Sequence, residues 1–340
     1  MIRELTGVIL RHARLSRLYY GAGRDERLHY CGVRIRLSAG VGGIVAVAAL
    51  LVALVASPAD ATPPGRDGLI AFVSHGSPVS RNYGIVLVRA DGRGLRNLTT
   101  NYRDRSPAWS PDGSKLVFER AGRLYVIGSD GNGLRPITPL RLNRATQPAW
   151  SPDGRLIAFV RGRTIYVMRS SGPAIHRIFQ RADAFVDRPA WSPDGRSIAF
   201  GLQAEGDLGG SIVVIPSTGG GAHYVTDGRI RDESSDPCCG ADDYQPDWSP
   251  DGTRLAFTRT VWYCGRCDVQ EIYSVGTDSS SIQSLTAADK SYAAFRPSWS
   301  PRGDRIAAET SRGAAILTAT GKLLRVLDPH GTEPVWQRLK

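Results

Sequence analysis

One seven-residue phrase recurs through this chain and constrains its fold more than any other feature. PAWSPDG stands at 107–113, 148–154 and 189–195, PDWSPDG at 246–252 and PSWSPRG at 297–303, and PVW at 334–336 begins a sixth copy without completing it. A phrase that returns every 37 to 57 residues is typical of one supersecondary unit stacked many times. The sequence therefore predicts a repeat architecture in place of a single irregular core.

Each unit predicts four short strands. The Pro-x-Trp-Ser part is a first strand, and Ser-Pro-Asp-Gly is a turn in which Pro presets φ, Asp caps locally and Gly takes positive φ. Alternating second strands follow at 114–119, 155–160, 196–201, 253–258 and 304–309, and a third strand and a Gly-rich turn lead to a fourth. No stretch of the body has a sustained helical period. The fold class is therefore all-β, and each unit forms one blade of a β-propeller.

The two ends of the repeat region complete one blade between them. Residues 68–73, 84–90 and 95–99 read as second, third and fourth strands that lack a first strand, and 333–337 reads as a first strand without a blade. We therefore predict a six-bladed β-propeller, closed by a C-terminal first strand that completes the N-terminal blade. Closure matters because an open propeller would leave sheet edges unpaired.

Six of the seven tryptophans occupy the same position of the repeat, and this position allows two interpretations. An aromatic stripe could bind a ligand, or the indoles could pack between neighbouring blades. Repetition at one structural position is what a core requires, so the sequence favours packing. The six are Trp109, Trp150, Trp191, Trp248, Trp299 and Trp336.

The repeat phrase, followed by an [Ile/Leu]-Ala-Phe strand and an [Ile/Leu]-Tyr-Val strand, resembles the repeats of the TolB-type β-propellers. The resemblance covers residues 68–337. It implies a six-bladed propeller in the bacterial periplasm or cell envelope, and protein–protein interaction more than chemistry. The α/β domain that precedes the propeller in TolB has no counterpart between residues 62 and 67, and no Gly-x-Ser-x-Gly elbow of a hydrolase occurs. We therefore transfer the fold and the mode of binding, and not the Tol–Pal partners.

The first 61 residues are interpreted as a targeting segment. Residues 37–56 are uncharged and follow Arg34 and Arg36, and a small-residue site ends at Ala61. This pattern predicts a secretory signal peptide, although the same length would serve an uncleaved membrane anchor. Residues 1–33 are basic for a signal, so translation from Val33 is a further hypothesis. We expect a propeller domain over 62–340 that is exported to the periplasm, the cell envelope or the medium.

The charge of the chain is +11, and part of it belongs to the N-terminal segment. Eight Lys and Arg residues stand against three Asp and Glu residues in positions 1–36. The remaining excess is modest and contains no Lys/Arg runs. We therefore expect no nucleic-acid partner, and a membrane partner only through an uncleaved N-terminal segment.

Variable loops predict where a ligand would bind. The Ser-Pro-Asp-Gly turns are uniform, whereas the loops between second and third strands and between blades vary in length, and function usually resides in such loops. Residues just before the first strands should line the mouth of the central channel. They are Arg105, Asp187, Arg188, Tyr244, Gln245, Arg296 and Glu333. His75 and His330 come from loops of the same face, and ordinary solvated loop charges remain the alternative.

Four cysteines fall in two loops of blade five. Cys238 and Cys239 precede its first strand, and Cys264 and Cys267 stand in a hairpin loop. Outside the cytoplasm they predict two cross-loop disulfides, of undetermined pairing. A four-thiolate zinc site is the alternative.

Two functions from different classes follow. The first is a non-enzymatic, monomeric exported propeller, without cofactor, metal or catalytic residues, that binds a protein or cell-envelope component through its variable loop face. The second is a hydrolase, lactonase or lyase with a small-molecule site at the central channel, using His75, His330, Glu333 and Asp187. A sugar-binding module would use Trp262, Tyr263 and Tyr244 as stacking platforms.

Overall fold

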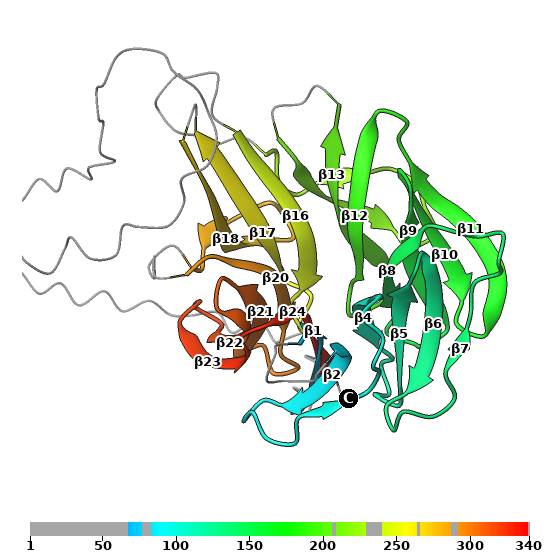
Figure 1. The fold of residues 1–340 in the computed structure, drawn as a ribbon. Coiled ribbons are helices and arrows are strands. Elements are labelled where there is room, and N and C mark those ends of the chain that lie inside the picture. Colours follow the sequence, from blue (N-terminus) through cyan, green and yellow to red (C-terminus); the bar gives the residue numbers. More distant parts are fainter. Residues whose placement is uncertain are drawn as a thin grey trace, which may run out of the picture. The chain divides into compact units, whose positions relative to one another are not determined.

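The computed structural model describes residues 67–76, 83–205, 209–228, 240–263, 266–286 and 292–338, with the backbone alone for residues 262, 263 and 266–269. These residues form six four-stranded antiparallel sheets. The six innermost strands surround one centre (Figure 1), which makes the fold a six-bladed β-propeller. Within the described part of the chain, no helix is both long and apolar enough to cross a membrane. The predicted segment 1–61 lies outside the described residues.

The blades follow one another along the chain. Blade 1 contains β24 (Gly331–Arg338), β1 (Asp67–His75), β2 (Tyr83–Arg89) and β3 (Arg96–Asn97). Blade 2 contains β4 (Asp104–Trp109), β5 (Lys115–Arg120), β6 (Arg123–Gly128) and β7 (Arg135–Pro136). Blade 3 contains β8 (Ala145–Trp150), β9 (Leu156–Arg161), β10 (Thr164–Arg169) and β11 (Gly172–Gln180).

The second half of the ring repeats this order. Blade 4 contains β12 (Ala184–Trp191), β13 (Ser197–Ala204), β14 (Ser211–Pro216) and β15 (His223–Tyr224). Blade 5 contains β16 (Gly240–Trp248), β17 (Arg254–Tyr263), β18 (Arg266–Gly276) and β19 (Gln283–Ser284). Blade 6 contains β20 (Ala294–Trp299), β21 (Arg305–Thr310), β22 (Gly313–Thr318) and β23 (Leu323–Asp328).

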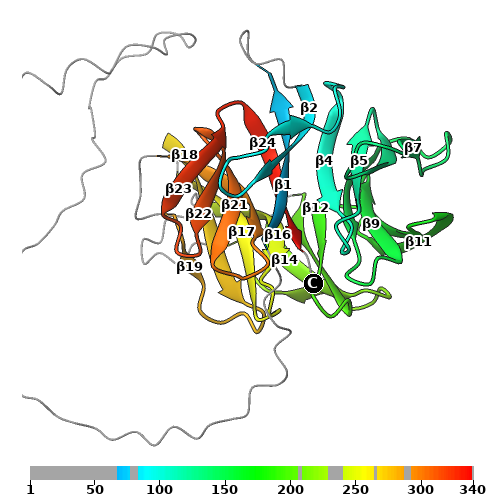
Figure 2. The ribbon, with the colours of Figure 1, turned by 90° about the horizontal axis from the view of Figure 1, so that it is seen from below.

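The C-terminal strand closes the ring as predicted. β24 pairs antiparallel with β1, with Trp336 opposite Ile70 and Arg338 opposite Asp67. The two strands lie side by side although they come from opposite ends of the described chain (Figure 2). The predicted fold class is therefore confirmed, including the exchange of one strand.

The Ser-Pro-Asp-Gly turns hold each first strand to its second strand. The Ser110 hydroxyl donates to Asp112 Oδ1 at 2.6 Å and the Gly113 amide donates to the Ser110 carbonyl at 2.8 Å. Gly113 has a φ of 69°, a region that glycine adopts without steric cost. The same Ser–Asp bond recurs at 2.6 Å in blades 3, 4 and 5. Uniform turns on one face leave the loops of the other face free to vary.

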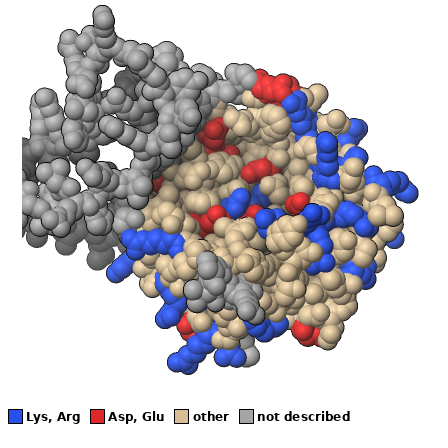
Figure 3. Space-filling model, in the orientation of Figure 1, with Lys and Arg blue, Asp and Glu red and all other residues tan. Residues whose placement is uncertain are grey.

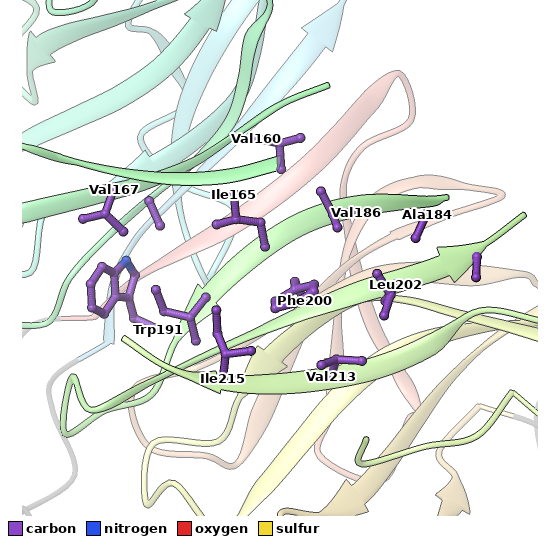
Figure 4. Close-up of a cluster of buried hydrophobic side chains, with 13 residues drawn as sticks. Val160, Ile165, Val167, Ala184, Val186, Trp191, Phe200, Leu202, Val213 and Ile215 are labelled. Carbon is purple, nitrogen blue, oxygen red and sulfur yellow. The ribbon is translucent and has the colours of Figure 1, made fainter. Parts of the chain in front are cut away.

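The apolar core consists of clusters between neighbouring blades. Five of the six repeat tryptophans are no more than 7% exposed, and Trp150 packs as a half-buried residue. Figure 4 shows Trp191 with Val167 and Ile165 of blade 3 and with Phe200 and Ile215 of blade 4. The indole Nε1 of Trp191 donates to the Ala149 carbonyl of the preceding blade at 3.1 Å. The tryptophans therefore pack between blades, as the sequence favoured.

Candidate binding site at the channel mouth

Each first strand contains a β-bulge at the same position. The pairing between first and second strands shifts register there, for example between Arg105 and Ala108 in blade 2. The residue three places before the tryptophan has a positive φ in every blade. These residues are Ser106, Gln147, Arg188, Gln245, Arg296 and Glu333, with φ between 36° and 58°. A non-glycine residue in this conformation is uncommon, and bulges of this kind redirect side chains.

The bulges are held by side chains of the preceding blade. The amide of Arg188 donates to Gln147 Oε1 at 3.0 Å, and the amide of Arg296 donates to Thr258 Oγ1 at 2.9 Å. The amide of Glu333 donates to Glu309 Oε2 at 3.0 Å. The Ser106 amide donates to the Glu333 carboxylate across the closure of the ring. These hydrogen bonds hold the backbone in an unfavourable conformation. Backbone strain that is held in this way is common at functional sites.

The predicted rim residues lie inside the first strands and not just before them. Arg105 belongs to β4, Asp187 and Arg188 to β12, and Tyr244 and Gln245 to β16. Arg296 belongs to β20 and Glu333 to β24. The expectation about their position was wrong because the bulge lets the ladder continue past the positive-φ residue. Residues opposite Arg105, Asp187 and Tyr244 in the second strands are Glu119, Gly201 and Thr258.

Charged groups of both signs meet at the channel mouth. Arg296 Nη1 lies 2.6 Å from Glu309 Oε2 and 3.6 Å from Glu333 Oε1. Acidic and basic side chains lie next to each other in the hollow at the centre of the molecule (Figure 3). Burial raises the pKa of Glu119, and the charge of Glu333 adds to that effect. We call Arg105, Glu119, Arg296, Glu309 and Glu333 the mouth cluster.

The His75 side chain lies near the mouth cluster, whereas His330 contacts His75 through its backbone carbonyl. His75 Nε2 lies 3.1 Å from Thr332 Oγ1. Partial burial lowers the pKa of His75, followed by the charge of Arg105. The His75 amide donates to the His330 carbonyl at 3.4 Å. Among the described residues, the imidazole of His330 has no hydrogen bond or ion pair, so the structure does not bring the two rings into one constellation.

Asp187 and Tyr244 line a cavity of about 320 Å³ between blades 4 and 5. Asp187 Oδ1 accepts from the amides of Gly201 and Gln245 at 3.0 and 3.4 Å. Burial raises the pKa of Asp187 to about 6 despite these bonds. The Tyr244 hydroxyl lies 2.8 Å from Thr260 Oγ1.

The predicted cysteine site and the predicted aromatic stacking platform involve side chains that the structure does not describe. Cys238, Cys239 and Cys264 are not among the described residues, and of Cys267 only the backbone is. The disulfides and the alternative zinc site therefore remain predictions. The same holds for stacking by Trp262 and Tyr263. Within the described ranges, no group of three His, Cys, Asp or Glu side chains could hold a metal ion.

Sequence reasoning missed a concentration of arginine on the loop face of blades 2 to 4. The loops of this face and the strand ends beside them contain nine arginines and four carboxylates, in segments 99–106, 119–123, 139–144, 161–163, 181–185 and 203–205. Three of the carboxylates pair with Arg120, Arg181 and Arg163. Six arginines, the arginine sector, have no ion pair among the described residues: Arg103, Arg105, Arg123, Arg141, Arg144 and Arg161. Basic side chains crowd the right side of Figure 3, where Figure 1 places these blades.

Neutral acceptors hold several of these guanidinium groups. Arg105 donates to the Tyr102 carbonyl at 2.8 Å, Arg123 to the Thr138 carbonyl at 2.9 Å and Arg161 to the Asn143 carbonyl at 3.2 Å. Arg141 and Arg144 are exposed. Neutral partners orient a guanidinium without cancelling its charge, so the sector presents a net positive surface. The sequence alone does not show this surface because its members come from four separate segments of the chain.

The protein is thus a closed six-bladed β-propeller, with uniform turns on one face and a charged channel mouth on the other. The family model of the TolB beta propeller domain matches residues 70–238. The propeller of this chain is a TolB-type β-propeller, which confirms the resemblance seen in its repeats.

Solved structures agree on the fold. A protein assigned as TolB from Agrobacterium tumefaciens is 20% identical, with 77% of this chain and 88% of that chain covered and a TM-score of 0.58. An oligogalacturonate lyase from Vibrio parahaemolyticus is 11% identical, with 77% and 82% covered and a TM-score of 0.50. A chain of a nidogen/laminin complex is 9% identical, with 80% and 99% covered and a TM-score of 0.62. No curated protein matches the sequence at a significant level. Identities this low concern the fold alone.

Proposed function

We propose that this protein is an exported, non-enzymatic propeller that binds a protein or another cell-envelope component on its variable loop face. The arginine sector carries the proposal, because six guanidinium groups without carboxylate partners favour a partner with an acidic contact surface. The mouth cluster lies at the inner end of the same face and adds hydrogen-bonding groups of both signs. The general periplasmic location of TolB-type propellers supports export.

The test compares two double variants in a pull-down from a cell-envelope extract with the full-length protein. Arg141 and Arg144, both exposed and without an ion pair among the described residues, are changed to Gln. Arg155 and Arg196 on the Ser-Pro-Asp-Gly face, 85% and 88% exposed, are changed to Gln as the matched control. We expect a partner that the control retains and the Arg141/Arg144 variant loses, with capture weakening as salt rises. Identical capture by all three proteins would sink the proposal.

One observation favours a second candidate, an enzyme with a small-molecule site. The cavity between blades 4 and 5 contains Asp187, whose pKa of about 6 suits a general acid or base near neutral pH. The test is hydrolase, lactonase and lyase assays on the wild type and on Asp187→Asn. An activity that this substitution abolishes would support the enzyme, and an activity unchanged by it would place the chemistry elsewhere.

A further inference from the structure

A second cavity occupies the opposite end of the central channel. It measures about 300 Å³ and is lined by the Pro-x-Trp-Ser-Pro segments of the blades. Its walls include Trp109, Trp150, Trp191 and Trp336 and the prolines of the repeat phrase. A cavity of this size is at the small end of the range that holds organic ligands. Most of the wall of this chamber is apolar, and its polar groups are four serines of the repeat phrase together with Arg188, Asp247 and Arg338.

Two of those polar groups are already paired. Arg338 Nη2 lies 2.6 Å from Asp247 Oδ2 and also donates to the Trp248 carbonyl at 2.9 Å. Asp247 Oδ2 accepts in addition from the Trp299 amide at 2.7 Å. Because these groups satisfy each other, neither leaves a strong unpaired charge for a ligand.

Arg188 differs because no described residue forms a hydrogen bond or an ion pair with its guanidinium. Its backbone amide donates to Gln147 Oε1, but within the described part of the chain no hydrogen bond or ion pair reaches the side chain. Burial lowers the pKa of Arg188, even though Glu333 and Asp187 act in the opposite direction. Arg188 is half-buried, and a cation withdrawn from water without a hydrogen-bond acceptor is costly. This cation lines the apolar chamber.

We propose that the chamber binds a small organic carboxylate with an apolar body, and that Arg188 receives the carboxylate. The planar guanidinium fork matches both oxygens of a carboxylate, and the indole and proline walls match an apolar body. A single unpaired cation in a chamber of this size favours a monocarboxylate over a polyanion. Arg188 stands on the side of the chamber that faces the mouth cluster, within reach of the charges of Glu333 and Arg296. No residue of the arginine sector lines the chamber, so the site does not depend on the proposed function.

The test is titration calorimetry of the full-length protein with phenylacetate and with phenethyl alcohol, which has the same apolar body and no charge. We expect phenylacetate to bind at least about tenfold more tightly than the alcohol, the effect of one charge-assisted bidentate contact. Arg188→Gln should lose that difference. The control Arg196→Gln removes an exposed arginine from the turn of the same blade and should keep it.

Two results would overturn the proposal. The first is equal binding of acid and alcohol by the wild type, a comparison that needs no variant to fold. The second is a gain of about tenfold or more in phenylacetate affinity, again the size of one such contact, when residues 339–340 are deleted. In that case the chain's own carboxyl end would occupy the chamber. Arg188→Lys, which keeps the charge without the planar fork, should fall between the wild type and Arg188→Gln.

Discussion

Single residues with strained backbone dihedrals recur on the innermost strands of this propeller. Among the described residues, ten other than glycine have a positive φ, and six of these occupy the one bulge position of the repeat. Such backbone strain persists only where the surroundings over-determine it. Here the surroundings are side chains of the preceding blade, as with Gln147 and the Arg188 amide. The bulges therefore couple neighbouring blades and aim side chains at the channel.

Ser106 allows this strain to be measured. Its φ is 50°, and glycine tolerates that conformation without the steric cost of a Cβ atom. We expect Ser106→Gly to be more stable than Ser106→Ala by about 1 kcal/mol in free energy of unfolding. Urea denaturation of the two variants measures the difference. Equal stabilities would mean that the bulge position stores no strain.

Asp187 predicts a dependence of stability on pH. Because its folded pKa is about 6, above the usual 3.9 of an unfolded Asp, the folded state binds the proton more tightly between these values. Stability therefore falls as pH rises from about 4 to about 6 and stays lower above that range. Asp187→Asn keeps an oxygen for the Gly201 and Gln245 amides without the charge. We expect it to be about 1–3 kcal/mol more stable than the wild type at pH 8, and no more stable at pH 4.

Denaturant unfolding across this range checks the sign. A constant difference between the two proteins from pH 4 to pH 8 would contradict the assignment to Asp187.

Part of the site could be read from the residues alone. Arg188, Gln245, Arg296 and Glu333 were predicted because each stands just before a predicted first strand. Gln147 holds the same position before Trp150 and was not predicted, although the spacing of the repeat points to it. Glu119 and Glu309 were missed for a different reason. They come from second strands, and the bulge shifts the pairing between strands in a way that no spacing reveals.

At the scale of strands, buried ion pairs stabilise the loop ends of two blades. In blade 5, Arg259 Nε lies 2.6 Å from Asp243 Oδ1, and both residues are buried. Arg120 and Asp104 form the equivalent pair in blade 2, also at 2.6 Å. In blade 3 the acidic position is Ala145, opposite Arg161. One blade position therefore holds either an ion pair, as in blades 2 and 5, or, as in blade 3, an arginine that pairs with a backbone carbonyl instead of a carboxylate.

This equivalence gives a matched experiment. Arg259→Met leaves Asp243 buried without its partner, which typically costs about 3–5 kcal/mol of stability. Arg161→Met removes an arginine from the same blade position without breaking an ion pair and should cost about 0.5 kcal/mol or less. Guanidinium denaturation of both variants tests the contrast. Similar losses would mean that the pair adds nothing beyond packing.

Strand boundaries were harder to predict than strand order. The alternation of residues 253–258 indicated a strand, but β17 continues to Tyr263 and β18 begins at Arg266. The hairpin thus extends through a segment interpreted as a variable loop. Leu255 and Phe257 are buried and give the alternation that marks the strand. Residues 258–260, Thr-Arg-Thr, then interrupt the apolar pattern, although the ladder continues through them.

At the scale of the whole molecule, the ring has one seam. Every other blade is continuous in sequence, whereas blade 1 joins β24 to β1 across the chain ends. Trp336 is 2% exposed and packs in a cluster shared by blades 6 and 1. The Gln337 side chain accepts from the Leu69 amide at 2.8 Å and donates to the Gly113 carbonyl at 2.9 Å, which ties the seam to blade 2. Closure therefore depends on contacts of this one strand with both neighbouring blades.

A circular permutation tests whether the seam is needed as a break in the chain or only as a set of contacts. Arg338 and Asp67 are paired at the ends of β24 and β1, so a short Ser-Pro-Asp-Gly linker should join them, as in the other blades. New termini between Asn101 and Tyr102 fall in the loop before β4, where Tyr102 is 64% exposed. Because every blade–blade contact is kept, we expect the permutant to fold with a melting temperature close to that of the unpermuted 67–338 region. Deleting 331–338 instead removes Trp336 and exposes the edge of β1, so that chain should aggregate or fail to fold. A stable, monomeric deletion variant would show that five complete blades and a three-stranded sheet suffice, and that folding does not require closure by the C-terminal strand.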